Sequence, residues 1–186
     1  METQIYMVRH AHSGYTPDEL NRPLSPQGEE AARRVADLLV EEQITAIISS
    51  PYRRAVQTVE PLAARASLTM QVEDDFRERL LADGHLEDFD HAIRKVWEED
   101  SFSWPGGESN LAAQHRGVRA LENVLHRYLG EKVAIGTHGN IMALMMNAFN
   151  PAYDFDFWKR LSMPDIYKLS FNQLTLTRVE RIWQAT

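Results

Sequence analysis

The amino-acid sequence predicts an α/β protein, a three-layer α/β/α sandwich in which helices cover both faces of a mostly parallel central sheet. Short apolar runs alternate with segments of helical periodicity along most of the 186 residues. This alternation is typical of parallel strands joined by crossover helices. Residues 166–171 and 174–183 instead alternate apolar and polar side chains. We expect them to pair around Asn172-Gln173 and to place an antiparallel strand at an edge of the sheet.

Four short apolar runs are predicted as the other strands. Their length is that of strands rather than helices, and a polar residue follows each of them. They are residues 5–8, 44–48, 70–72 and 132–136.

Ser-Pro pairs mark the starts of the first two predicted helices, at Ser25-Pro26 and Ser50-Pro51. A serine side chain accepts a hydrogen bond from a first-turn amide, and proline suits the first helical position. Apolar residues at helical spacing follow, namely Ala31, Ala32, Val35, Leu38 and Leu39 in the first helix and Val56, Val59, Leu62 and Ala63 in the second. Further helices are predicted over residues 87–99, 109–129 and 141–149, and the last is nearly all apolar and therefore buried.

A single domain is predicted over residues 1–186, because no repeat, low-complexity segment or linker divides the chain. The irregular segment from about residue 73 to 107 interrupts the alternation of strands and helices. We expect it to form a short helical insertion that lies as a lid over the active site.

Composition narrows the classes of function. The formal net charge is −7 and basic residues gather only in pairs, which argues against a nucleic-acid partner. No apolar run is long enough to span a bilayer, and the first residues do not resemble a signal peptide. The absence of cysteine excludes disulfides and thiolate chemistry. We therefore expect a cytoplasmic protein without a membrane partner.

Histidines and arginines follow the predicted strands at their carboxyl ends. Arg9-His10 follows the first strand, Arg53-Arg54 lies just beyond the second, and His138-Gly139 follows residues 132–136. Ligands of open α/β sheets bind at this edge, where helix N-termini attract anions. The planar guanidinium of arginine can bond two phosphate oxygens. A lone arginine or histidine here would be solvated or structural, but their convergence predicts a site for phosphate or carboxylate.

The histidines also raise the alternative of a metal site. A hydrolytic metal site normally includes well-placed carboxylates, and none stands beside His10, His12 or His138. We therefore predict neither a metal nor another cofactor. His12 alternates with His10 on an extended chain, so we expect its side chain to point away from the site.

Four motifs, in this order, resemble those of the histidine phosphatase superfamily, which has the phosphoglycerate-mutase-like fold. They are Val8–Ser13, with Ala11 where the family has Gly, Ser49–Thr58, Phe76–Arg79 and Thr137–Asn140. The first motif alone is a weak signal, whereas all four in order are specific. The resemblance points to the short bacterial phosphatase branch.

The resemblance implies a metal-independent phosphomonoesterase of the histidine acid phosphatase type, acting on small phosphate esters. His10 would carry a phosphohistidine intermediate and Glu78 would protonate the leaving group. The phosphate oxygens would be bound by Arg9, Arg54, His138, Gly139 and Thr16, the last standing where the family often has Asn. Glu78 could instead pair with Arg77 or Arg79, and Asp74 and Asp75 are its nearest competitors as the acid.

Other members of the superfamily remain as alternatives. Mutases tend to be longer, with a basic insertion that holds the substrate carboxylate, whereas the insertion here is short and acidic (Glu87, Asp88, Asp90, Glu98, Glu99 and Asp100). Protein phosphohistidine phosphatases are typically smaller. A non-catalytic phospho-ligand-binding module is a third alternative. The aromatic-rich segment 153–167 could pack under the lid, line the pocket or form a dimer face, and the sequence leaves the oligomeric state open, a homodimer included.

Overall fold

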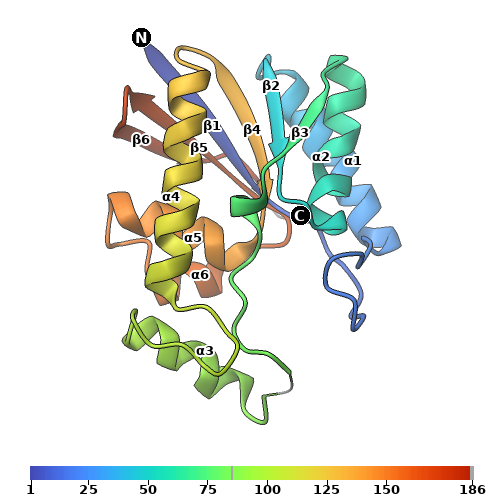
Figure 1. Ribbon diagram of the computed structural model, residues 1–186. Coiled ribbons are helices and arrows are strands. Elements are labelled where there is room, and N and C mark those ends of the chain that lie inside the picture. Colours follow the sequence, from blue (N-terminus) through green and yellow to red (C-terminus); the bar gives the residue numbers. More distant parts are fainter. Residues whose placement is uncertain (85, 185–186) are drawn as a thin grey trace.

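The computed structural model describes residues 1–84 and 86–184, which form one six-stranded sheet with helices on both faces (Figure 1). The strands are β1 (Glu2–Arg9), β2 (Ala46–Ser49), β3 (Met70–Val72), β4 (Lys132–Thr137), β5 (Asp165–Asn172) and β6 (Thr175–Arg181). The helices are α1 (Pro26–Val40), α2 (Arg53–Ala66), α3 (Phe89–Glu98), α4 (Asn110–Arg127), α5 (Gly139–Phe149) and α6 (Phe155–Arg160).

The strand order is β3-β2-β4-β1-β5-β6. Strands β3, β2, β4 and β1 pair in parallel, whereas β5 pairs antiparallel with both β1 and β6. The predicted mostly parallel α/β sheet with an antiparallel edge is therefore confirmed. The last two strands turn around Gln173, which adopts a left-handed conformation with φ of 55°.

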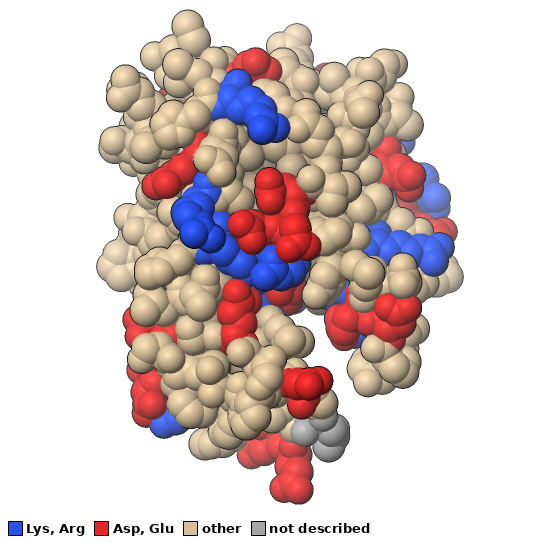
Figure 2. Space-filling model, in the orientation of Figure 1, with Lys and Arg blue, Asp and Glu red and all other residues tan. Residues whose placement is uncertain are grey.

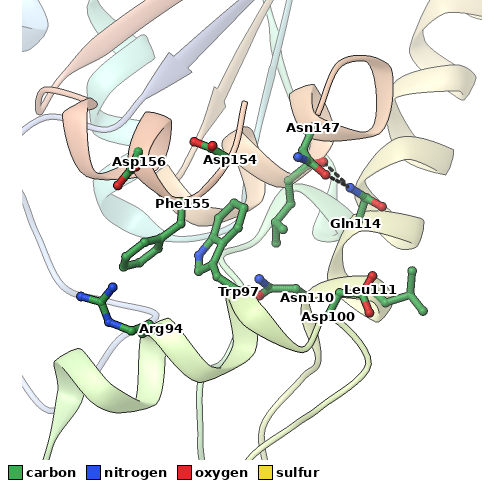
Figure 3. Close-up of a pocket in the computed structure, with 11 residues that line it drawn as sticks. Arg94, Trp97, Asp100, Asn110, Leu111, Gln114, Asn147, Asp154, Phe155 and Asp156 are labelled. Carbon is green, nitrogen blue, oxygen red and sulfur yellow. Dashed lines mark hydrogen bonds between the residues drawn. The ribbon is translucent and has the colours of Figure 1, made fainter. Parts of the chain in front are cut away.

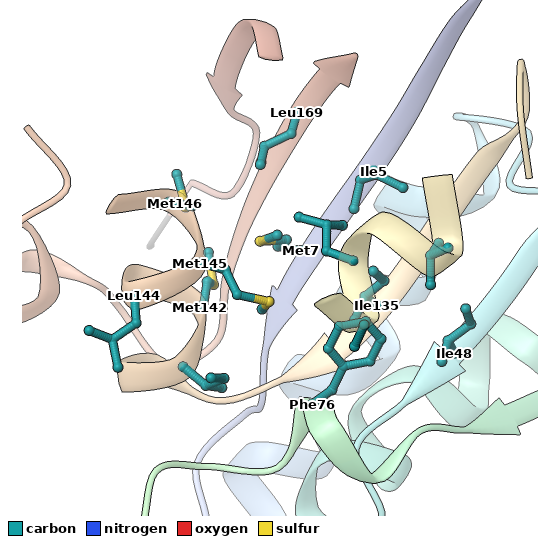
Figure 4. Packing of buried hydrophobic residues seen from close by; sticks show 14 of the residues in the cluster. Ile5, Met7, Ile48, Phe76, Ile135, Met142, Leu144, Met145, Met146 and Leu169 are labelled. Atoms are coloured by element: carbon teal, nitrogen blue, oxygen red, sulfur yellow. The ribbon is translucent and has the colours of Figure 1, made fainter. Parts of the chain in front are cut away.

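Alternate side chains of the strands enter two separate cores. Ile5 and Met7 of β1 pack with α4 and α5 on one face, in the cluster that Figure 4 shows. Tyr6 and Val8 pack with α1 and α2 on the other face. This period of two follows from the pleat of a strand that is covered on both sides. The strand is therefore held rigidly up to its last residue.

Two details of the predicted helices are wrong. Leu38 is exposed, because the buried stripe of α1 runs through Ala32, Val35 and Leu39. Ser25 does cap α1 by accepting the Gly28 N–H. Ser50 does not cap α2, because that helix begins three residues later, at Arg53. The Ser50 hydroxyl is therefore available for a hydrogen bond with His138, which is described below.

The expected insertion contains a 3₁₀ turn (Asp74–Phe76) and α3, which lies at one end of the molecule, beyond the sheet (Figure 1). Lys and Arg side chains lie interspersed with Asp and Glu on the face shown in Figure 2, which is hollowed near this end. None of the described helices has the length and apolar character that crossing a membrane requires.

Candidate active site

The predicted histidines meet at the carboxyl ends of β1 and β4. Arg9 and Thr137 are paired in the sheet, so the residues that follow them, His10 and His138, emerge side by side. The His10 N–H donates to the Thr137 carbonyl at 2.9 Å. The centroids of the two imidazole rings lie 5.2 Å apart, with an angle of 63° between the planes.

The His10 ring is held in one tautomer. Nδ1 lies 2.7 Å from the Ala11 carbonyl oxygen, which can only accept, so Nδ1 carries the proton and Nε2 keeps its lone pair. The Nε–H of Arg54 donates to that Nε2 at 3.3 Å. Burial, reinforced by the charge of Arg54, lowers the pKa of His10 to about 3. The ring is therefore neutral at physiological pH.

Arg54 reaches the site from the first turn of α2, and 4% of it is exposed. Its Nη1 donates to the Glu19 carbonyl at 2.8 Å, and its Nη2 lies 3.2 Å from the Glu19 carboxylate. The guanidinium also lies over the Tyr52 ring, 4.9 Å from its centroid. These contacts fix its plane beside His10.

His138 lies between β4 and α5 and is completely buried. Its Nε2 is 2.7 Å from the Ser50 hydroxyl, which itself accepts the Tyr52 N–H at 3.3 Å. Within the described structure Nδ1 has no hydrogen-bond partner. Burial, reinforced by the charge of Arg54, lowers the pKa of His138 well below its ordinary value.

Arg9 and Gly139 depend on each other. A Cβ at position 139 would come within 2.9 Å of the Arg9 Nε, so only glycine lets the guanidinium lie against the start of α5. Nη1 of Arg9 donates to the carbonyls of Leu161 and Ser162, and its buried Nε has no partner among the described residues. Burial lowers the pKa of Arg9. The unpaired Nε–H of this half-buried cation suits an anionic ligand.

Glu78 holds the start of α5. Its Oε1 accepts the N–H groups of Arg79 and Ile141 at 2.9 Å, and its Oε2 accepts the Asn140 N–H at 3.0 Å. Both lone pairs of Oε1 are engaged, whereas Oε2 keeps one lone pair that can carry a proton, so Oε2 is the oxygen that can act as a general acid. Burial lowers the pKa of Arg9 and of Arg54, and the charge of Glu78 opposes this lowering at both, which places its carboxylate close to both.

The loop that carries Glu78 is fixed by Arg116 of α4, a residue that the sequence analysis did not identify. Arg116 donates to the carbonyls of Asp75, Arg77 and Glu78 at 2.7, 2.9 and 3.3 Å. Glu108 binds the same guanidinium through both carboxylate oxygens. In the sequence, Glu108 is marked only by its position directly after the glycine pair Gly106-Gly107.

The remaining predicted residues lie differently. The Thr16 hydroxyl donates to the Asp18 carbonyl at 3.2 Å, within its own loop, and no described hydrogen bond joins it to His10. Arg22 of the same loop does act on the site, since its charge contributes to the lowered pKa of His10. His12 contacts the Ser25 hydroxyl and is exposed, as expected. Asp74 and Asp75, the alternatives to Glu78 as the acid, both form ion pairs with Arg77.

Two neutral histidines, the buried Arg54 and the half-buried Arg9 lie together at the carboxyl edge of the sheet. With this site and its α/β fold, the protein is a hydrolase that acts on phosphate monoesters. The family model of the histidine phosphatase superfamily, branch 1, matches residues 5–184, and the chain belongs to this superfamily.

Named relatives include phosphatases and a mutase-like protein. Phosphoserine phosphatase 1 of Hydrogenobacter thermophilus is 27% identical over 168 residues, which are 83% of this chain and 80% of that one. Phosphoglycerate mutase-like protein 4 of Arabidopsis thaliana is 27% identical over 165 residues, 80% of this chain and 72% of its own. The native structure of a mycobacterial glucosyl-3-phosphoglycerate phosphatase has the same fold, with a TM-score of 0.80 at 22% identity and all of both chains covered.

Proposed function

We propose that the protein hydrolyses phosphomonoesters through a phosphohistidine on His10. One observation carries the proposal: His10 is buried and neutral, with the proton on Nδ1 and the lone pair on Nε2. A neutral imidazole is not repelled by a phosphate dianion, and its lone pair can attack phosphorus. Covalent catalysis then divides one difficult step into two easier ones.

In the first step, the His10 Nε2 lone pair forms a bond to phosphorus while the bond from phosphorus to the ester oxygen breaks. The Arg54 N–H that contacts Nε2 moves to a phosphate oxygen, where Arg9 and His138 also donate. Positioned cations and donors of this kind supply most of the stabilisation in phosphoryl transfer. The leaving oxygen takes a proton from Glu78, whose Oε2 has a lone pair that is not engaged with α5.

In the second step, a water oxygen attacks phosphorus, the bond from phosphorus to Nε2 breaks, and Glu78 takes the proton of the water. The cycle releases an alcohol and inorganic phosphate. Gly139 contributes by leaving room for the Arg9 guanidinium. Thr16 would join the phosphate only if its loop closed further, so its role remains a prediction.

We further propose that the alcohol carries a carboxylate, as the names of the phosphatase relatives imply for their substrates. A hollow of about 470 Å³ next to Arg9 supports this. Its cations are Arg9, Arg94 and Lys159, and Asp90 is the one carboxylate among its lining residues. Arg94 comes from the insertion, so the insertion presents a cation here despite its acidic composition.

The test is to trap the intermediate. The protein is mixed with phosphoserine in EDTA, quenched in alkali, which preserves phosphohistidine, and digested for mass spectrometry. We expect phosphate on the His10 peptide, and His10→Ala should lower kcat by at least about ten-thousandfold. Turnover without phosphorylated His10 would contradict the mechanism, and strict dependence on added metal would contradict it as well.

The reaction product distinguishes the proposed phosphatase from the mutase alternative. Phosphorus NMR with 3-phosphoglycerate distinguishes release of inorganic phosphate from migration of the phosphoryl group to the neighbouring oxygen. We expect release, because the proposed second step delivers the phosphoryl group to water.

A further inference from the structure

Thr58 lies in the second turn of α2, at the end of the motif Ser49–Thr58, and is completely buried. Its Oγ1 accepts the N–H of Ala11, the residue after the nucleophile, at 2.9 Å. The same hydroxyl donates to the carbonyl of Arg54 at 2.7 Å. One side chain thus connects the neighbour of His10 in the sequence to the backbone of the arginine that faces His10 in space.

The direction of each hydrogen bond in this connection is fixed by the groups at its ends. An amide N–H can only donate and a carbonyl oxygen can only accept, so the Thr58 hydroxyl points its proton to Arg54 and a lone pair to Ala11. The Ala11 carbonyl in turn accepts from Nδ1 of His10 at 2.7 Å. Ala11 therefore orients the His10 ring through its carbonyl and is itself oriented through its N–H.

The three residues from His10 to His12 are each held by a different element. The N–H of His10 donates to β4, and the carbonyl of His12 accepts the N–H of Ser25 at the start of α1. Ala11, between them, is completely buried, and α2 holds its N–H through the Thr58 side chain. A buried N–H that loses its acceptor is costly, so without the hydroxyl Ala11 shifts to recover a partner.

Side-chain hydrogen bonds in a hollow beside the site connect helices instead. This hollow of about 370 Å³ lies between α3, α4, α5 and α6 (Figure 3). There Gln114 of α4 donates to the Asn147 side chain of α5 (dashed lines in Figure 3). Such a contact stabilises the packing of one helix on another, whereas the Thr58 contact ends on the residue that orients the nucleophile.

We propose that Thr58 is a positioning residue for phosphoryl transfer, which holds Ala11 so that the His10 lone pair stays directed at the phosphate. The inference rests on the proposed function, because it assigns Thr58 a part in the attack by His10. The side chains that bind the phosphate in that proposal are fixed by other contacts, namely those of Arg9, Arg54 and His138. Loss of the Thr58 hydroxyl should therefore slow the attack and leave phosphate binding intact.

The test separates attack from binding in Thr58→Val, which replaces the hydroxyl by a methyl group of nearly the same size. The single-turnover rate constant for release of p-nitrophenol from p-nitrophenyl phosphate reports the attack. We expect it to fall about thirtyfold, because a displacement of about an ångström has effects of this order. The Kd for inorganic phosphate, measured by calorimetry, should change by less than about twofold, since ground-state binding is untouched. Thr58→Ser keeps the hydroxyl and should restore most of the rate constant.

Thr3 of β1 provides the matched control for a role in stability alone. Its hydroxyl is also completely buried and also accepts a backbone N–H at 2.9 Å, from Gly130 at the amino end of the strand. Thr3→Val should lower the urea midpoint, as Thr58→Val does, and should leave the single-turnover rate constant unchanged. Equal rate constants for the two variants would mean that Thr58 contributes to stability only.

Three further results would contradict the positioning role. One is a rate constant that Thr58→Ser fails to restore, and another is a weaker Kd for phosphate with an unchanged rate constant. If Thr58→Val does not fold, Thr58→Cys replaces it, because a thiol is a weaker acceptor; an unchanged rate constant in that variant is the third. Absence of hydrolysis by the unmodified protein would instead remove the phosphatase function itself.

Discussion

Two regions border the hollow next to Arg9 and differ in the burial of their side chains. The edge is formed by the carboxyl ends of β1 and β4, and the wall is formed by α3 and α6. At the edge, His10, His138 and Arg54 are buried, and each side chain is fixed by hydrogen bonds, to Ala11, Ser50 and Glu19 respectively. At the wall, Arg94 and Lys159 are exposed and lie against the Phe155 ring, 5.2 and 4.9 Å from its centroid.

This difference in burial indicates which region performs phosphoryl transfer and which selects the substrate. Phosphoryl transfer requires groups held to within a fraction of an ångström, which a buried strand end provides. Selection among alcohols requires only a complementary surface, which exposed helices outside the sheet can supply. Substitutions of His10, His138 and Arg54 at the edge should therefore affect every substrate alike, whereas wall substitutions should change the ratio between substrates.

The largest effect is expected for Arg54→Gln. The variant loses the guanidinium that faces His10 and, in our proposal, binds the equatorial oxygens. We expect kcat/KM to fall about a thousandfold for phosphoserine and for p-nitrophenyl phosphate alike. A fall for one substrate only would contradict the uniform role of the edge.

Glu78→Gln should show the next largest effect, and it depends on the leaving group. Without an acid, kcat should fall about a hundredfold for an alkyl ester such as phosphoserine, and little for p-nitrophenyl phosphate, whose leaving group needs no proton. The amide also opposes the N–H groups at the start of α5, so the free energy of unfolding should fall by about 1 kcal/mol. Equal slowing of both esters would mean that another group is the acid.

Gly139→Ala tests the close approach of Arg9 to α5. The new Cβ would lie 2.9 Å from the Arg9 Nε and must displace the guanidinium. We expect kcat/KM to fall about thirtyfold for all substrates, because a displacement of about an ångström has effects of this order. Gly14→Ala is the matched control, since a Cβ there meets nothing within 4 Å. Equal activity of both variants would contradict the role of Gly139.

The edge was predictable because its geometry follows from strand pairing alone. Once β1 and β4 are neighbours, the residues after Arg9 and Thr137 must meet, whatever the rest of the chain does. Long-range contacts from loops and helices were not predictable in this way. The sequence does not indicate that Arg54 donates to Glu19 or that Arg116 donates to the Glu78 carbonyl. Both pairs come together only in the folded chain.

The same limit applies to the wall. The acidic composition of the insertion argues against a mutase with a basic insertion, yet α3 contributes the cation Arg94 to the hollow next to Arg9. Composition averages over all faces of a helix, and only the structure shows which face meets the ligand. Segment 153–167, whose role the sequence left open, supplies Phe155 and Trp158 to that hollow.

The neutral state of His10 predicts a pH dependence of stability. Its pKa is about 3 in the folded protein, whereas an unfolded histidine titrates near 6.5. Below pH 6.5 the unfolded chain therefore binds a proton that the folded protein does not, so stability falls as the pH decreases toward 3. The contribution is about 1.4 kcal/mol, or tenfold in the folding equilibrium, per pH unit. Urea denaturation between pH 6 and 4 should show a shallower loss for His10→Gln, and an unchanged slope for the exposed control His115→Gln. Identical slopes for both variants would mean that His10 is not held neutral.

The smallest effect is expected at the wall, and it separates the two regions most directly. Phosphoserine and phosphoethanolamine differ by one carboxylate, so the ratio of their kcat/KM values measures recognition of that group. Arg94→Met should lower this ratio about fivefold, mostly through KM, since an exposed ion pair contributes up to about 1 kcal/mol. Lys95→Met, the adjacent residue of α3 that pairs with Glu99, should leave the ratio unchanged. If Arg94→Met slowed both substrates equally, the wall would act on the phosphoryl group, and the division between the two regions would be wrong.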